Sequence, residues 1–286
     1  MANVLVPTDF SAASGNAADV AVEIAKITKA QIHFLHIINT SVDWIKLSKE
    51  EHRKYPDLKK KISHANDQLK ILVQAAEKND VKAETSISYQ TDDDEISDHF
   101  RRIDHDFVVV ASKRDKRKMS FFSGSFTPQI IRRSACPVLL VPESFSFKPF
   151  RKIVFTSSFN DEAGYPFEMI VKFADQFDSE IDLLYVNLPF QFEESDQSKA
   201  KMKSFLRWCP RGGTCNINIY NSLNEERGIL KFSREIGADL IAITTHGRTG
   251  FMKMISPSIT ESLVRSSEVP VLSINPDLLP AEMIEN

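Results

Sequence analysis

The sequence predicts an α/β protein built from two doubly wound, parallel, five-stranded sheets in a tandem repeat. The first observation is the repeat itself: Asp106 and the apolar run after it recur as Asp239 and its following run, an offset of 133 residues. Earlier in the chain the offset is 149 residues, as between Ile32 and Ile181. The second observation is that short apolar runs alternate with helical patterns, which is typical of a parallel sheet covered by helices on both faces.

The first copy supplies five strands in alternation with helices. Val4-Leu-Val-Pro7 is an apolar run ended by proline, as in a buried parallel strand, and Ser11 or Ser14 is placed to cap the helix after it. The remaining elements are expected as a strand at 32–38, a helix at 56–78, a strand at 83–89, a helix at 96–103, a strand at 107–111, a helix at 125–133 and a strand at 138–141.

The second copy repeats this alternation, beginning with a helix whose apolar stripe runs from Phe167 to Phe177. We therefore expect one domain at 1–142, a linker at 143–150, a second domain at 151–276 and a C-terminal tail at 277–286. The linker is short, so the copies should pack against each other. Each copy ends in an apolar fifth strand, and an exposed apolar edge is an aggregation hazard. We expect these two strands to pair within one chain, and two chains can then associate as a homodimer.

Composition indicates a globular protein without a strongly charged partner. Charged residues make up 26% of the chain, hydrophobic residues make up 42%, and the formal net charge is −3. Neither nucleic acid nor membrane is therefore expected as a partner. Three cysteines cannot all pair, so a reduced, cytoplasmic protein is predicted. Cys209 and Cys215 lack the spacing of a zinc half-site, and are interpreted as loop residues or a reversible redox pair.

Ligands of doubly wound sheets bind beyond the carboxyl ends of the strands, so the loops after the first and fourth strands are the expected site. Asp9 follows the first strand, and its carboxylate can accept hydrogen bonds from an adenine amine or a ribose hydroxyl. The alternative is that Asp9 caps the next helix, which its position alone favours. The second copy has Ser158 there, which can cap but has no carboxylate. His36, equivalent to Tyr185, is interpreted as structural.

Gly124 and Ser125 open the last helix of the first copy, where backbone N–H groups and the helix dipole favour an anion. Just before them, the run Lys113–Lys118 has five basic residues in six. This run can contribute charge to a phosphate site or can be a solvated loop, and both interpretations stay open. The acidic run Asp92–Glu95 is interpreted as a charged helix start and not as a metal site. No nucleophile–base pair can be assembled, so no catalytic residue is assigned.

Taken together, these residues resemble the universal stress protein family. Val6-Pro-Thr-Asp9, Thr245-His-Gly-Arg-Thr-Gly250 and Cys136-Pro-Val-Leu-Leu-Val match family motifs at corresponding places. The resemblance covers nearly all of the chain and implies a tandem member. It also implies the adenine nucleotide alpha hydrolase-like fold, with ATP or AMP as the cofactor.

The family's phosphate motif, Gly-x-x-Gly followed after nine residues by Gly-Ser, is degenerate in both copies. The first copy keeps Gly124-Ser125 but has Ala111 and Arg114 at the two leading glycines. The second copy has Thr244 at the first glycine and Pro257, which lacks a backbone donor, at the third. Nucleotide is therefore expected to bind weakly, and only in the first copy. The candidate residues are Pro7, Asp9, Ile37, Ala111, Lys113, Arg114, Gly124 and Ser125.

The resemblance implies a non-enzymatic cytoplasmic protein that acts in the stress response through protein partners, which the sequence does not identify. The alternative is a structural or protein-interaction module that binds no nucleotide. A slow ATPase is the least favoured function.

Overall fold

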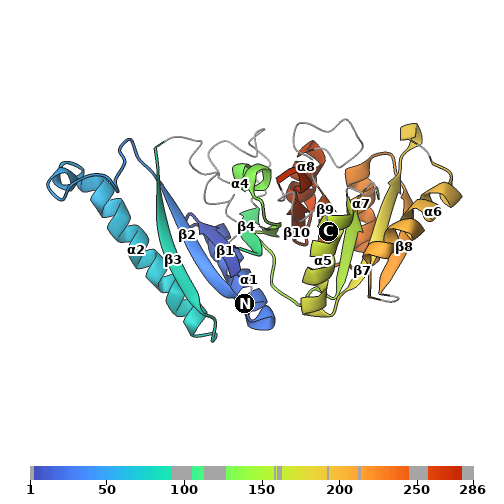
Figure 1. Ribbon diagram of the computed structural model, residues 1–286, viewed down its shortest axis with the longest axis horizontal. Helices are drawn as coiled ribbons and strands as arrows, with labels where there is room; N and C mark the ends of the chain where they lie inside the picture. Colours follow the sequence, from blue (N-terminus) through green and yellow to red (C-terminus); the bar gives the residue numbers. More distant parts are fainter. Residues whose placement is uncertain are drawn as a thin grey trace.

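Both copies contribute to one ten-stranded sheet in the computed structural model (Figure 1). The strand order is β3-β2-β1-β4-β5-β10-β9-β6-β7-β8. The structure describes residues 3–91, 105–112, 127–157, 159, 163–191, 193–211, 214–244 and 257–278. The expected helix at 96–103 and the charged runs at 92–95 and 113–118 lie outside these residues. Within them, no helix is long and apolar enough to cross a membrane.

The first half forms its elements near the expected bounds. Its strands are β1 (Asn3–Thr8), β2 (Gln31–Asn39), β3 (Ala83–Gln90), β4 (Phe107–Ser112) and β5 (Val138–Pro142). Its helices are α1 (Ala12–Thr28), α2 (Pro56–Glu77) and α4 (Thr127–Arg133), with a short 3-10 helix η1 (Glu51–Lys54). Ser11 is the N-cap of α1, because its side chain accepts the N–H of Ser14. This confirms one of the two expected caps.

The second half repeats the arrangement with shorter connections. Its strands are β6 (Lys152–Thr156), β7 (Glu180–Asn187), β8 (Cys215–Asn221), β9 (Leu240–Thr244) and β10 (Val271–Ile274). Its helices are α5 (Gly164–Phe177), α6 (Ser195–Phe205), α7 (Glu225–Glu235) and α8 (Pro257–Ser266). Short 3-10 helices are η3 (Pro189–Gln191), η4 (Leu206–Trp208) and η5 (Pro276–Leu278).

The two fifth strands join the halves. β10 runs antiparallel to β5, with Val271 opposite Leu140 and Ser273 opposite Val138. The pairs within each half are parallel. Both fifth strands are buried along their whole length. The two five-stranded sheets are therefore halves of a single sheet, whose edges are β3 and β8.

Helices cover both faces of the sheet, and each face has its own apolar core (Figure 1). One core lies under α1, α2, α5 and α6, and the other under α4, α7 and α8. Successive strand residues point to opposite faces, so Val6 belongs to the first core and its neighbour Leu5 to the second. Both faces are thus buried, as expected for continuous apolar strands.

The linker is packed at the seam between the halves. Phe150 is fully buried, and its ring lies 5.8 Å from that of Phe173 in α5. Phe173 also meets Phe107 of β4 edge-on, with ring centres 5.7 Å apart. At the start of the linker, the Asn16 amide of α1 donates to the Pro142 carbonyl at 3.2 Å. The first core is therefore continuous across both halves.

An aspartate at equivalent positions holds the start of the first strand in each half. The N–H of Asn3 donates to the Asp106 carboxylate at 2.6 Å. Asp239 accepts the N–H groups of Arg151 and Lys152, both at 3.0 Å. The repeated aspartates thus align β1 with β4 and β6 with β9.

Candidate functional site

Pro7 ends the pairing of β1 with β4 early. β1 pairs with β2 through its last residue, Thr8, but with β4 only through Leu5. On the β4 side, the Asn3 carbonyl accepts the N–H of Asp106. Alternate residues of a strand bond to the same neighbour, so Leu5 and Pro7 also face β4. Proline has no N–H, and the ladder to β4 therefore stops before Pro7.

The second half has no such interruption. Thr156 occupies the position equivalent to Pro7, and its N–H is available. β6 accordingly pairs with β9 up to Thr156, which lies opposite Ile243. The strand order reverses at the first strand of each half. β1 lies between β2 and β4, and β6 lies between β7 and β9. The halves thus differ in backbone pairing at the place where doubly wound sheets bind ligands.

Asp9 lies exposed just beyond β1, and Ser11 orients its carboxylate. Oδ1 of Asp9 accepts the N–H of Ser11 at 3.0 Å and the Ser11 hydroxyl at 2.5 Å. Ser11 itself caps α1. The alternative that Asp9 caps the helix is therefore wrong: Asp9 binds the capping residue. The result is a carboxylate of fixed orientation at the carboxyl edge of β1.

Phe10 and His36 lie beside Asp9 and were not assigned to the site from the sequence. Phe10 has a φ of 59°, in the left-handed region that costs a non-glycine residue about 1 kcal/mol or more. Its ring stacks on His36, with ring centres 4.3 Å apart. Nδ1 of His36 lies 2.8 Å from the Thr8 carbonyl. A carbonyl only accepts, so Nδ1 donates and Nε2 of the neutral ring is an acceptor.

The repeat carries a signal that could have identified Phe10. Phe159 lies 149 residues later, in the equivalent loop, and has the same left-handed backbone, with a φ of 54°. Phe159 is only 3% exposed. Its ring lies edge-on to Phe155 and Phe205, at 5.9 and 5.2 Å between ring centres. The second half thus buries in its core the aromatic residue that the first half leaves at the edge of the sheet.

Polar side chains of the second half interact around Tyr185 of β7, which is equivalent to His36 of β2. Burial, and then the Glu193 carboxylate, raise the pKa of Tyr185 to about 12. Glu193 also accepts the Ser198 hydroxyl at 3.3 Å and lies 4.0 Å from Lys201 Nζ. The surroundings of Tyr185 are therefore occupied by the chain's own side chains.

The structure describes half of the predicted site. Pro7 and Asp9 lie at the end of β1, Ile37 is buried within β2, and Ala111 is half-buried near the end of β4. Lys113, Arg114, Gly124 and Ser125 lie outside the described residues, as does the second-copy motif at 245–250. In the described part of the chain, no group of three or more His, Cys, Asp or Glu could hold a metal ion.

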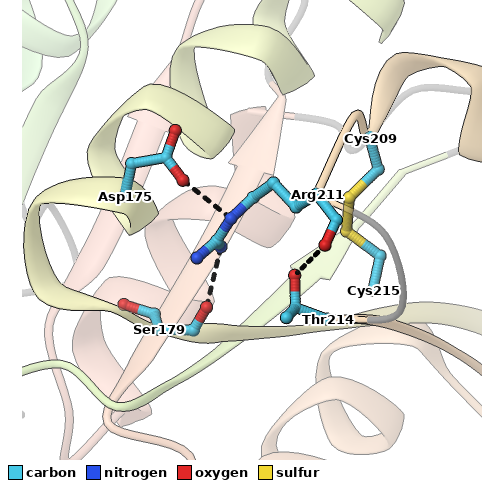
Figure 2. Close-up of a disulfide and its surroundings, with 6 residues drawn as sticks. All are labelled: Asp175, Ser179, Cys209, Arg211, Thr214 and Cys215. Carbon is cyan, nitrogen blue, oxygen red and sulfur yellow. Dashed lines mark hydrogen bonds and ion pairs between the residues drawn. A yellow bond between two sulfur atoms is a disulfide. The ribbon is translucent and has the colours of Figure 1, made fainter.

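The cysteines differ from the predicted reduced state. Cys209 and Cys215 form a disulfide (Figure 2). Cys136 is a buried thiol that donates to the His105 carbonyl. The expectation of a fully reduced chain is therefore wrong for this pair, whose Cα atoms lie 6.8 Å apart at a sequence separation of 6.

Comparisons with known proteins agree with this architecture. The profile described as the universal stress protein family matches residues 1–142 and 222–275. A similar solved structure is a universal stress protein from Archaeoglobus fulgidus DSM 4304, with a TM-score of 0.75, 22% identity and coverage of 96% of this chain and 98% of that one. No curated protein matches the chain.

Two further structures share the fold at lower identity. One is a universal stress protein from Pseudomonas aeruginosa UCBPP-PA14, with a TM-score of 0.61, 13% identity and coverage of 99% of this chain and 96% of that one. The other is the cytoplasmic domain of a prokaryotic cation chloride cotransporter, with a TM-score of 0.56, 10% identity and coverage of 96% of both chains. The likeness thus extends over both halves.

Proposed function

Because this chain belongs to the universal stress protein family, we propose that it is a non-enzymatic cytoplasmic protein of the stress response whose first half binds adenine nucleotide, ATP or AMP, weakly. The difference between the two carboxyl edges supports this proposal most. In the first half, Pro7 interrupts the strand pairing and Asp9 presents an oriented carboxylate. In the second half β6 pairs with β9 up to Thr156, Phe159 is buried, and Tyr185 is half-buried against the core.

Asp9 would bind the base or the ribose. Its carboxylate accepts hydrogen bonds, which suits an adenine amine or a ribose hydroxyl. Ser11 already holds the carboxylate in place, so little ordering is left for the ligand to impose. Gly124 and Ser125 would bind the phosphates, with charge from Lys113 and Arg114. Side-chain charge at a surface is screened by salt, so the affinity should fall as ionic strength rises.

Weak binding follows from the missing glycines. Each charge-assisted hydrogen bond that a ligand loses costs about 1.5–3 kcal/mol, and about 1.4 kcal/mol corresponds to tenfold in affinity. Ala111 and Arg114 stand where the family has two glycines in its phosphate loop. A protein-interaction module that binds no nucleotide remains the alternative, since two such losses could abolish binding.

Isothermal titration with ATP and with AMP tests the proposal. We expect measurable binding to the wild type and a loss of about tenfold or more in affinity for Asp9→Asn, which keeps the shape of the side chain but removes its charge. Asp178→Asn is the matched control. Asp178 is 94% exposed and lies in the second half, between α5 and β7, so its replacement should leave affinity unchanged.

Three outcomes separate the candidate functions. Binding that survives Asp9→Asn unchanged would place the nucleotide elsewhere and contradict the proposal. If titration gives no heat of binding, and freshly purified protein releases no nucleotide when it is denatured, the interaction module is favoured. Phosphate release from ATP that Asp9→Asn abolishes would favour the slow ATPase.

A further inference from the structure

A covalent link in the second half joins the end of η4 to the start of an edge strand. Cys209 follows η4, and Cys215 is the first residue of β8, which borders the ten-stranded sheet. Both cysteines are half-buried, and Pro210 beside them is exposed. The disulfide is therefore near the surface, where a reductant can reach it.

The same segment is attached to α5 by contacts that do not need the disulfide. Nε of Arg211 lies 2.7 Å from the Asp175 carboxylate, and its Nη1 donates to the Ser179 carbonyl at 2.7 Å (Figure 2). The Arg211 side chain is only 12% exposed. On the strand side, the Thr214 carbonyl accepts the N–H of Ile181 at 2.9 Å. None of these contacts involves a sulfur atom, so we expect them to keep the two cysteines near each other after reduction.

Trp208 attaches the other end of the segment to the start of α5. Its indole lies so close to Gly164 that an added Cβ would be 2.3 Å from Cε2. Gly15 occupies the equivalent place in α1, and an added Cβ there meets nothing within 4 Å. Lys78–Lys82, which leads into β3 in the first half, contains no cysteine. The disulfide and its tryptophan are thus features of the second half alone.

We propose that Cys209 and Cys215 are a reversible thiol–disulfide exchange site, and that oxidation locks the segment around Arg211 onto α5. Disulfides in reducing compartments are usually transient and redox-sensing. Here the loop is short and its ends are already held, so the bond can re-form after reduction without refolding of the domain. The proposal rests on the cytoplasmic location proposed above, and not on nucleotide binding by the first half.

The exchange needs a thiol reductant such as glutathione. A reductant thiolate attacks one sulfur of the pair, the S–S bond breaks, and the other cysteine leaves as a thiolate that takes up a proton. A second reductant thiolate then attacks the mixed disulfide, and the remaining cysteine leaves and is protonated. Two electrons and two protons reach the pair, and the reductant becomes a disulfide.

Alkylation in glutathione buffers tests the exchange on the full-length wild type. The protein is equilibrated at graded ratios of reduced to oxidised glutathione, alkylated, and analysed by peptide mass spectrometry. We expect Cys209 and Cys215 to be modified together in reducing buffer and protected in oxidising buffer, while the buried Cys136 stays unmodified throughout and so reports that the fold is intact. The proposal would be overturned if Cys209 and Cys215 became modified only in denaturant, under conditions that also expose Cys136.

Trypsin tests the lock. Cleavage after Arg211 should be about tenfold faster, or more, in the reduced than in the oxidised protein, because the closed loop restricts local opening. Cys136→Ser should show the same dependence, and the double variant Cys209→Ser/Cys215→Ser should be cleaved rapidly in both buffers. Equal cleavage rates for the oxidised and reduced wild type would overturn the lock, even if the double variant failed to fold.

Discussion

Replacing Gly164 by alanine measures how tightly Trp208 packs on α5. The added Cβ would lie 2.3 Å from Cε2, 2.6 Å from Cζ2 and 2.8 Å from Cδ2 of the indole. These atoms belong to one rigid ring, so the whole side chain must move. Overpacking of this kind costs about 1–3 kcal/mol, and the helix preference of alanine offsets at most about 1 kcal/mol. We expect a net loss of about 1–2 kcal/mol in the free energy of unfolding.

Gly15→Ala is the matched control, because the same change in α1 meets nothing within 4 Å. Its expected effect is a stabilisation of up to about 1 kcal/mol. Urea denaturation followed by far-ultraviolet circular dichroism measures both variants. In a Trp208→Ala background, the cost of Gly164→Ala should disappear, a coupling of about 1–3 kcal/mol. Equal effects at the two glycines, or an unchanged cost without the indole, would refute this reasoning.

Two further predictions concern stability. Asp239→Ala should lower the free energy of unfolding by about 2–3 kcal/mol in urea denaturation, because the side chain is 10% exposed and accepts two backbone N–H groups. Asp106→Ala loses one such bond at an exposed site and should cost about 1 kcal/mol. A larger loss for Asp106→Ala than for Asp239→Ala would contradict the role of these hydrogen bonds. The folded-state pKa of Tyr185 is raised from 10.0 to about 12, so the unfolded chain loses this proton first and stability should fall as pH rises from 10 towards 12, by about 1 kcal/mol after allowance for solvent screening. Tyr185→Phe should remove that part of the alkaline loss in thermal melts, and an unchanged pH profile would argue against the raised pKa of Tyr185.

Local patterns in the sequence were enough for the fold and for part of the candidate site. Apolar spacing and the repeat predict the alternating strands and helices, because burial on both faces of a parallel sheet requires those patterns. The same patterns place Pro7 and Asp9 at the end of the first strand, where the structure has them. Each acts through a property of its own residue, a missing N–H in one case and a carboxylate at a strand end in the other.

The tertiary structure decided what depends on side chains that are distant in the chain. The stacking of Phe10 on His36, and the proton on Nδ1 of His36, require β1 and β2 to lie side by side. The sequence left Cys209 and Cys215 as loop residues or a redox pair, since a spacing does not fix the positions of the Cβ atoms. The apolar fifth strands were predicted from the sequence, but their antiparallel register is set only when both halves are folded. Residue type and local period are properties of the sequence, whereas contacts between distant segments arise only when the segments are packed.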